Sequence, residues 1–229
     1  YMKKTLRMGD LLNLNSIAIK RRLQVILESK NLIMENVYGQ NPLSFEELYN
    51  WCESQAEYFR NYICDTGKLL NNAAEAGKNI LFEAQLGALR DIDYGIYPYT
   101  SSSNTIAAYA PIGAGIPQRT PDRVVGVMKA YSTCVGEGPF AAEDAMPEEW
   151  NNKLRNAGGE FGAATGRPRR VGPFDAVASR YGIECQGADD IALTKLDVLS
   201  EFDTIPVVTA YELCLLYTSP SPRDMRRSR

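Results

Sequence analysis

Four consecutive residues near the C-terminal end of the sequence have the types and spacing needed to recognise a purine base. Thr194, Lys195, Leu196 and Asp197 follow a short apolar run. The Asp197 carboxylate can accept two hydrogen bonds from the ring N–H and the exocyclic amine of guanine, while the Lys195 stem packs along the base. Adenine does not offer both donors in that arrangement, so the pair would select guanine. A solvated Lys/Asp loop is the competing interpretation of so short a pattern.

A second segment combines the groups that bind small anions. Between Glu160 and Arg170 there are two glycines, a threonine and three arginines. Arginine forks bind carboxylate or phosphate through paired hydrogen bonds, and glycines let backbone N–H groups approach the same anion. We therefore predict an anionic small ligand here. The alternative is a solvated basic turn that Glu160 and Asp175 neutralise in part.

Two further loops could meet a ligand. Residues 91–105 end in five hydroxyl side chains and one amide, which can donate to phosphate oxygens, although an ordinary polar loop has the same composition. Residues 135–140 form a glycine loop in which the backbone can come close to a bound molecule.

The first third of the sequence is predicted to be helical. Apolar residues recur at helical spacing at Ile19, Leu23, Ile26 and Leu27. Ser44 and Glu47 form a capping box that starts a second helix. One face of that helix carries the apolar residues Leu48, Trp51, Cys52, Phe59 and Ile63. We interpret both stripes as core contacts rather than as a cofactor site.

From Gly77 onward, short apolar runs alternate with turn residues. Residues 79–83, 191–195 and 206–211 are predicted to be buried strands, and residues 121–131 and 174–181 are predicted to be crossover helices. This alternation predicts an α/β fold with a mainly parallel central sheet flanked by helices. Ligands of such sheets bind beyond the carboxyl ends of the strands, where the loops described above begin.

Composition excludes several classes of protein. The 229 residues are 45% hydrophobic and 23% charged, which is typical of a globular chain and not of a fibre or a disordered tail. With 25 basic and 28 acidic residues there is no basic field for nucleic acid, and no apolar run approaches the roughly 20 residues of a membrane span. Histidine is absent, which excludes an imidazole base or ligand within this chain. The five cysteines have no metal-ligand spacing and indicate free thiols in a reducing compartment.

The ends of the sequence predict a piece of a longer protein. It opens at Tyr1 without a signal peptide, and residues 217–229 are rich in Pro, Ser and Arg with little to bury. We expect a helical subregion at 1–76, an α/β part at 77–216 that carries the nucleotide and aspartate site, and a non-native or disordered tail at 217–229, with a basic interaction tail as the alternative.

Taken in order, these segments resemble the adenylosuccinate synthetase family. The resemblance runs from Lys3 to Glu212, through the segments 82–87, 91–95, 100–105, 129–140, 160–170 and 193–198. It implies a P-loop-NTPase-like synthetase fold, here truncated. It also implies a GTP-dependent ligase of AMP biosynthesis: GTP phosphorylates O6 of IMP, and the amine of L-aspartate then displaces that phosphate to give adenylosuccinate.

The resemblance implies a role for each matched residue. GTP binding would fall to Arg169, Lys195, Leu196 and Asp197. Aspartate binding would fall to Ala163, Ala164, Thr165, Gly166, Arg167, Pro168 and Arg169, with Thr165 meeting the aspartate carboxylates. IMP binding would fall to Lys3, Gln85, Thr100, Ser101, Val135 and Arg167, with Lys3 reaching the partner's site across a homodimer interface. Gln85 is the candidate catalytic residue, because it would position the base and stabilise charge growing on O6.

The sequence departs from the family pattern at several of these positions. Leu86 stands where the family has its glutamine, Tyr94 replaces a customary His, Cys134 a customary Arg, and Ala164 a second Thr. The family's phosphate loop and its catalytic Asp and His belong to a part that this sequence does not contain, so we expect the chain to be inactive alone and the Mg²⁺ ligands to lie outside it. The resemblance further implies a cytoplasmic location.

Two alternatives remain open at this point. One is a purine-nucleotide-binding regulatory module without catalysis. The other is a related ligase that uses a guanine nucleotide as acceptor, because the departures at Gln85 and Ala164 fall around the acceptor.

Overall fold

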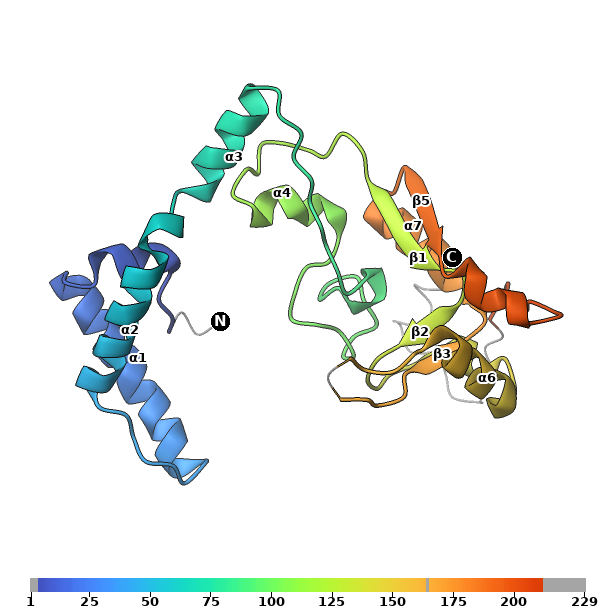
Figure 1. The fold of residues 1–229 in the computed structure, drawn as a ribbon, viewed down its shortest axis with the longest axis horizontal. Coiled ribbons are helices and arrows are strands. Elements are labelled where there is room, and N and C mark those ends of the chain that lie inside the picture. The colour runs from blue at the N-terminus through green and yellow to red at the C-terminus, as the bar shows by residue number, and fades with distance from the viewer. Residues whose placement is uncertain (1–3, 164, 212–229) are drawn as a thin grey trace, which may run out of the picture. The chain divides into compact units, whose positions relative to one another are not determined.

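Two units make up the chain in the computed structural model, which describes residues 4–163 and 165–211 (Figure 1). We call Tyr1–Asn79 the helical unit and Ile80–Arg229 the α/β unit. The predicted tail at 217–229, Lys3, Ala164 and Cys214 lie outside the described residues.

The helical unit is built on an antiparallel helix pair. It contains the α-helices α1 (Ile17–Asn36), α2 (Phe45–Phe59) and α3 (Thr66–Glu75), with 3-10 helices η1 (Met8–Asn13) and η2 (Arg60–Tyr62). Its core joins α1 and α2 to the residue that follows η1, through Leu14, Leu23, Cys52 and Ala56. The helix predicted from the Ile19-to-Leu27 spacing is confirmed as α1, which buries Leu23 and Leu27.

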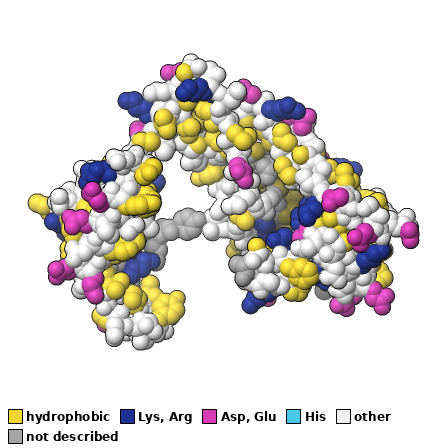
Figure 2. Space-filling view, in the orientation of Figure 1, with side chains coloured by type: hydrophobic (Ala, Val, Ile, Leu, Met, Phe, Trp, Pro, Cys, Tyr) yellow, Lys and Arg dark blue, Asp and Glu magenta, His cyan; other side chains and the backbone are white. Residues whose placement is uncertain are grey.

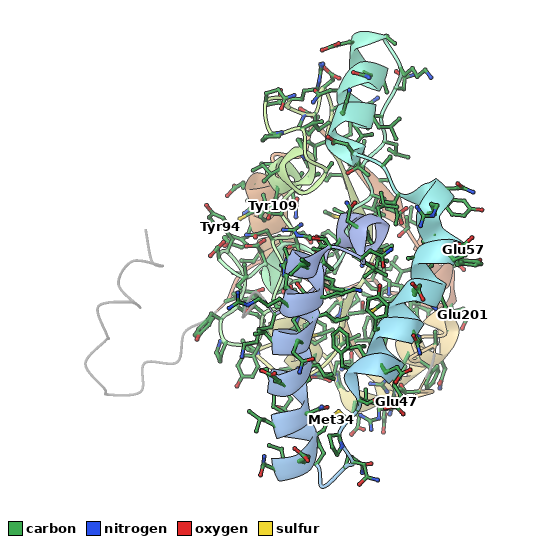
Figure 3. All side chains as sticks on the ribbon, turned by 90° about the vertical axis from the view of Figure 1, so that its left-hand side faces the viewer. Met34, Glu47, Glu57, Tyr94, Tyr109 and Glu201 are labelled. Atoms are coloured by element: carbon green, nitrogen blue, oxygen red, sulfur yellow. The ribbon has the colours of Figure 1, made fainter. Side chains whose placement is uncertain are left out.

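The capping box predicted at Ser44 is present in both directions. Glu47 N donates to Ser44 Oγ at 3.2 Å, and Ser44 N donates to the Glu47 carboxylate at 2.8 Å. The hydrogen bond from the Ser44 side chain, together with that from its backbone N–H, lowers the pKa of Glu47. Figure 3 shows Glu47 near the first turn of α2 and Glu57 toward its other end.

The predicted core role of Trp51 is wrong. Its side chain is 61% exposed, whereas its neighbour Cys52 is buried. In an α-helix adjacent residues are about 100° apart, so the narrow face that buries Cys52 and Ala56 turns Trp51 outward. Ile63, predicted to lie on the same helix face, comes after the end of η2. Figure 2 shows hydrophobic side chains on the surface of this unit.

The α/β unit confirms the predicted α/β class, and its described residues form three two-stranded sheets. β1 (Val125–Lys129) pairs in parallel with β5 (Asp190–Thr194), and β4 (Phe174–Asp175) pairs in parallel with β6 (Val207–Val208). β2 (Ser132–Cys134) and β3 (Arg170–Gly172) are antiparallel. The helices are α4 (Ala110–Gly113), α5 (Ala141–Asp144), α6 (Glu148–Gly158) and α7 (Ala176–Gln186), with 3-10 helices η3 (Ala88–Arg90), η4 (Ala107–Tyr109) and η5 (Leu196–Glu201).

Several predicted elements differ from those observed. The helix predicted over 121–131 is wrong, because its valines form β1, where β-branched side chains are favoured. The strand predicted over 79–83 is also wrong: among the described residues no strand pairs with it, and Leu81 is 93% exposed. The strand predicted at 191–195 is confirmed as β5 but is exposed rather than buried, and the one predicted at 206–211 is reduced to β6.

The crossover helix predicted over 174–181 begins slightly later than expected. Phe174 and Asp175 form β4, and α7 follows directly from Asp175, whose carboxylate accepts from Ala178 N at 2.9 Å. An Asp at this N-cap position satisfies a backbone donor that the first helical turn leaves unpaired.

The core of the α/β unit lies behind the ends of β1 and β5. Ala130 and Tyr131 follow β1, and Val198 and Leu199 belong to η5; they pack with Leu154 of α6 and Val171 of β3. The Trp150 and Phe202 rings extend this core, with centroids 5.0 Å apart. Burial of these side chains fixes η5, and with it the segment that begins at Lys195.

Among the described residues, no helix is long and apolar enough to cross a membrane. Cys52, Cys64, Cys134 and Cys185 are free thiols, as predicted.

Candidate functional site

The predicted guanine-reading residues lie at the carboxyl edge of the parallel β1–β5 pair. Lys129 and Thr194 are opposite each other at the ends of the two strands, which run side by side (Figure 1). Lys195 follows with a positive φ of 63° and turns the chain into η5, whose first turn carries Asp197. Both side chains are exposed. Open strand ends of this kind are where parallel sheets bind ligands.

A buried carboxylate, Glu160, anchors this edge. It is 2% exposed and accepts from Lys129 Nζ at 2.7 Å, from the Tyr131 hydroxyl at 2.6 Å and from Arg169 Nη1 at 2.9 Å. Two cations face one carboxylate, so a positive charge remains at the surface of the cluster. Lys195 Nζ donates to Gly158 O at 3.3 Å, two residues before Glu160, and so joins the cluster to the segment predicted to bind guanine.

Protonation of this cluster follows from its contacts. Burial alone would raise the pKa of Glu160, but the hydrogen bonds from Lys129, Tyr131 and Arg169 outweigh it and hold that pKa below its usual value. Burial and the hydrogen bond to Glu160 together raise the pKa of the Tyr131 phenol. Glu160 is therefore ionised, and Tyr131 is a hydrogen-bond donor, at neutral pH.

The segment predicted to bind an anion is a closed loop. A bridge joins Phe161 to Pro168, Arg169 N donates to Glu160 O at 2.9 Å, and Gly162 N donates to Arg167 O at 2.8 Å. The tip is exposed at Ala163, Thr165, Gly166, Arg167 and Pro168. The loop therefore presents the Thr165 hydroxyl and the exposed Arg167 side chain at its tip, while Arg169 is held at its base.

The polar turn at 91–105 is organised by Asp91, which is fully buried. Its carboxylate accepts from the backbone N–H groups of Asp93, Tyr94 and Thr105, at 2.9, 3.0 and 2.5 Å. Burial would raise the pKa of Asp91, but these N–H donors lower it overall. Asp91 is thus a structural carboxylate that shapes the turn. Within the turn, Ser101 Oγ donates to Arg90 O at 2.9 Å, and Thr100 beside it is half-buried.

Arg90 links this turn to the glycine loop. Its Nη2 donates to Val135 O at 3.0 Å and to Cys134 Sγ at 2.8 Å. The structure therefore brings together Ser101 and Val135, which the sequence places 34 residues apart. Sequence reasoning missed Arg90 because a single arginine after a predicted strand has no distinctive spacing.

Gln85 is not joined to this group. It is exposed in the segment before η3, next to Leu86, whose φ is +75°. Among the described residues, no hydrogen bond joins its side chain to Ser101 or Val135. A left-handed conformation is costly for a leucine, so this segment carries local strain.

The described residues do not fit a metal site. They contain no group of three or more Cys, Asp or Glu side chains placed to hold a metal ion. We therefore assign no chemical step in this chain to Mg²⁺.

The sequence matches the family profile described as adenylosuccinate synthetase over residues 1–226. The chain belongs to the adenylosuccinate synthetase family. It is 46% identical over 209 residues to the adenylosuccinate synthetase of Trichlorobacter lovleyi, covering 91% of this chain and 47% of that protein. For the protein of that name from Geobacter sulfurreducens the identity is 45%, with the same coverage.

A solved structure agrees with this assignment. The fully ligated adenylosuccinate synthetase of Plasmodium falciparum superposes with a TM-score of 0.74 at 32% identity, covering 86% of this chain and 45% of that one. The chain thus spans about half the length of the relatives it matches. Family membership confirms the resemblance seen in the sequence motifs.

Proposed function

We propose that this chain is part of an enzyme that joins L-aspartate to IMP at the expense of GTP, forming adenylosuccinate. The observation that carries the proposal is the position of Lys195 and Asp197, exposed at the carboxyl edge of a parallel strand pair beside the Glu160 cluster. Membership of the family supplies the reaction, and this geometry supports a guanine site at that edge.

The chain's own residues would bind and orient the three substrates. Asp197 accepts the two guanine N–H donors, and the Lys195 stem packs on the base. The positive charge left over at the Glu160 cluster favours the adjacent GTP phosphates, with Arg169 as the contact. Because η5 is anchored by buried Val198 and Leu199, Asp197 is held in place before the base arrives.

The exposed loop tip would hold the aspartate substrate. Thr165 donates to its carboxylates, Ala163, Ala164 and Gly166 belong to the same binding segment, and Arg167 contacts both aspartate and IMP. Thr100, Ser101 and Val135 hold the IMP nucleotide, and Gln85 its base. In the reaction, O6 of IMP takes the γ-phosphoryl group of GTP and GDP leaves. The aspartate amine then attacks C6, forming the C–N bond and losing a proton, and the C6–O6 bond breaks to release inorganic phosphate.

We further propose that the 229 residues do not complete this reaction alone. The chain has no histidine and spans about half of its relatives. Mg²⁺ would neutralise the transferring phosphoryl group, with its ligands outside this chain. A cytoplasmic homodimer, with Lys3 reaching the partner's nucleotide, completes the proposal.

Calorimetric titration of the 229-residue chain with GTP and then ATP tests the guanine site. We expect GTP to bind more tightly than ATP, and Asp197→Ala to weaken GTP binding at least tenfold, since it removes both acceptors for the base. Glu201→Ala is the matched control, because it removes an exposed carboxylate from the same 3-10 helix. Equal affinity for GTP and ATP, or an unchanged affinity in Asp197→Ala, would contradict the assignment.

A further inference from the structure

One guanidinium joins three separate segments of the α/β unit. Arg90 Nη1 donates to Tyr99 O and, at 3.4 Å, to Glu137 O, while Nη2 donates to Cys134 Sγ at 2.8 Å and to Val135 O at 3.0 Å. A planar group with five donors can satisfy acceptors on several segments at once. Arg90 is half-buried and uses this capacity on acceptors of its own unit.

The backbone of the same residue holds the serine turn. Arg90 O accepts from Ser101 N at 2.8 Å and from Ser101 Oγ at 2.9 Å. Ser101 and Val135, the two groups proposed to contact IMP, are therefore both bonded to Arg90, one through its carbonyl oxygen and the other through its guanidinium. The distance between them depends on where Arg90 lies.

The glycine loop is held from its other side as well. Arg170 Nη1 donates to Gly138 O at 2.8 Å, and Arg170 Nε pairs with Glu143 at 2.6 Å. These contacts fix the loop to β3 and α5. They do not reach the Ser101 turn, whereas the Arg90 guanidinium donates both to Tyr99 O beside that turn and to Val135 O and Glu137 O in the loop.

We propose that Arg90 is a positioning residue for the IMP site: by holding the Val135–Glu137 backbone against the Ser101 turn, it sets the separation of the groups that bind the nucleotide, without contacting the nucleotide itself. The proposal rests on the function proposed above. It adds a residue that none of the family motifs in the sequence includes, and it predicts that IMP binding, but not GTP binding, depends on that residue.

Three substitutions in the 229-residue chain separate this role from a general loss of structure. Arg90→Met keeps much of the apolar stem and removes every donor. Arg90→Lys keeps a positive charge but has no fork, so it can hold fewer of the acceptors. Arg180→Met removes an exposed guanidinium from α7 and serves as the matched control.

The first readout is cleavage by glutamyl endopeptidase after Glu137, which lies in the loop that Arg90 holds. Cleavage requires local opening, so we expect it to be about tenfold faster in Arg90→Met, intermediate in Arg90→Lys and unchanged in Arg180→Met. Glu83, in an exposed extended segment, and Glu184, within α7, are internal references whose cleavage should not change. Faster cleavage after Glu184 in Arg90→Met would show that this variant has unfolded. The comparison of Arg90→Lys with the wild type would then test the proposal.

The second readout is the affinity for IMP and for GTP measured by calorimetry. We expect Arg90→Met to weaken IMP binding about tenfold, Arg90→Lys to restore part of it, and GTP binding to stay constant. Unchanged cleavage after Glu137, unchanged IMP affinity, or an equal loss of IMP and GTP affinity would overturn the proposed role of Arg90. A wild-type chain that binds no IMP would instead contradict the function proposed for these loops, a distinguishable failure.

Discussion

Lys129 Nζ lies 2.7 Å from Glu160 Oε1, although the two residues are 31 positions apart in the sequence. Lys129 is the last residue of β1, and Glu160 is the first residue of the 160–170 segment predicted to bind an anion. This ion pair therefore holds that segment against the end of β1. The Glu160 carboxylate is almost fully buried, while the Lys129 ammonium is partly exposed. The Tyr131 hydroxyl and Arg169 Nη1 also donate hydrogen bonds to this carboxylate. The pair therefore connects the proposed aspartate loop to the proposed guanine edge.

Replacing Glu160 by glutamine should destabilise the α/β unit. The change leaves Lys129 and Arg169 facing each other without a counter-charge, and breaking a buried pair in this way costs several kcal/mol. Because both cations are about 30% exposed and keep part of their hydration, we expect a smaller loss of about 2 kcal/mol. Urea unfolding measures it. Glu149→Gln, at an exposed position of α6, should change the free energy of unfolding by less than about 0.5 kcal/mol.

The same carboxylate should make stability depend on pH. The pKa of Glu160 is held below its ordinary value of 4.5 in the folded chain, so the folded state loses its proton at lower pH than the unfolded state. Its contribution to the free energy of unfolding is therefore complete above the unfolded pKa and is lost as the pH falls through the folded pKa.

Urea unfolding of the wild type and of Glu160→Gln between pH 3 and pH 7 checks this sign. The stability difference between them should be constant near neutrality and shrink as the pH falls below about 4.5. A difference that grew on acidification would mean that burial, rather than the Lys129 and Arg169 contacts, dominates the pKa.

Local signals in the sequence predicted α1, the start of α2 and the strand before the proposed guanine segment, because short-range interactions decide them. The Ser44–Glu47 capping box spans three residues, and Lys195–Asp197 follows a single strand, so neither required knowledge of the rest of the fold. The α/β class followed from the alternation of short apolar runs with helical segments.

The errors come from interactions between distant residues. The two valines of residues 125–129 favour a strand only weakly in so short a segment, and pairing with β5, more than sixty residues later, decides in favour of β1. The apolar run at 79–83 has strand composition but no pairing strand among the described residues. Arg90 was missed for the same reason, since its importance lies in acceptors up to 47 residues away.

Removing the cap of α2 should weaken the helical unit modestly. Ser44→Ala removes the acceptor for Glu47 N, and such caps contribute about 1 kcal/mol. Ser54→Ala is the matched control, because Ser54 lies within α2, where its hydroxyl donates to Trp51 O at 2.7 Å and accepts from Gln55 Nε2 at 3.4 Å, and so does not cap the helix. Hydrogen exchange of the first α2 amides should accelerate in Ser44→Ala and not in Ser54→Ala. Equal effects would show that the cap contributes nothing specific.

Two glycines of the loop that Arg90 holds should respond differently to alanine. Gly136 and Gly138 both have positive φ, at 82° and 113°, so alanine is strained at either position by about 1 kcal/mol or more. A Cβ at Gly136 would meet nothing within 4 Å, whereas a Cβ at Gly138 would lie 2.7 Å from Cγ of the Tyr99 ring. A rigid aromatic ring cannot yield at its Cγ, so the loop itself must move.

We therefore expect Gly138→Ala to cost about 2 kcal/mol more than Gly136→Ala in urea unfolding, and to speed cleavage after Glu137 as Arg90→Met does. Both effects have one cause, because Tyr99 touches both partners. Its ring lies against Gly138 of the loop, and its carbonyl oxygen accepts a hydrogen bond from Arg90. In the double variant Arg90→Met, Gly138→Ala, the two losses should be smaller than their sum, since either change alone already separates the loop from the turn. Strictly additive losses would mean that the ring contact and the guanidinium act on the loop independently.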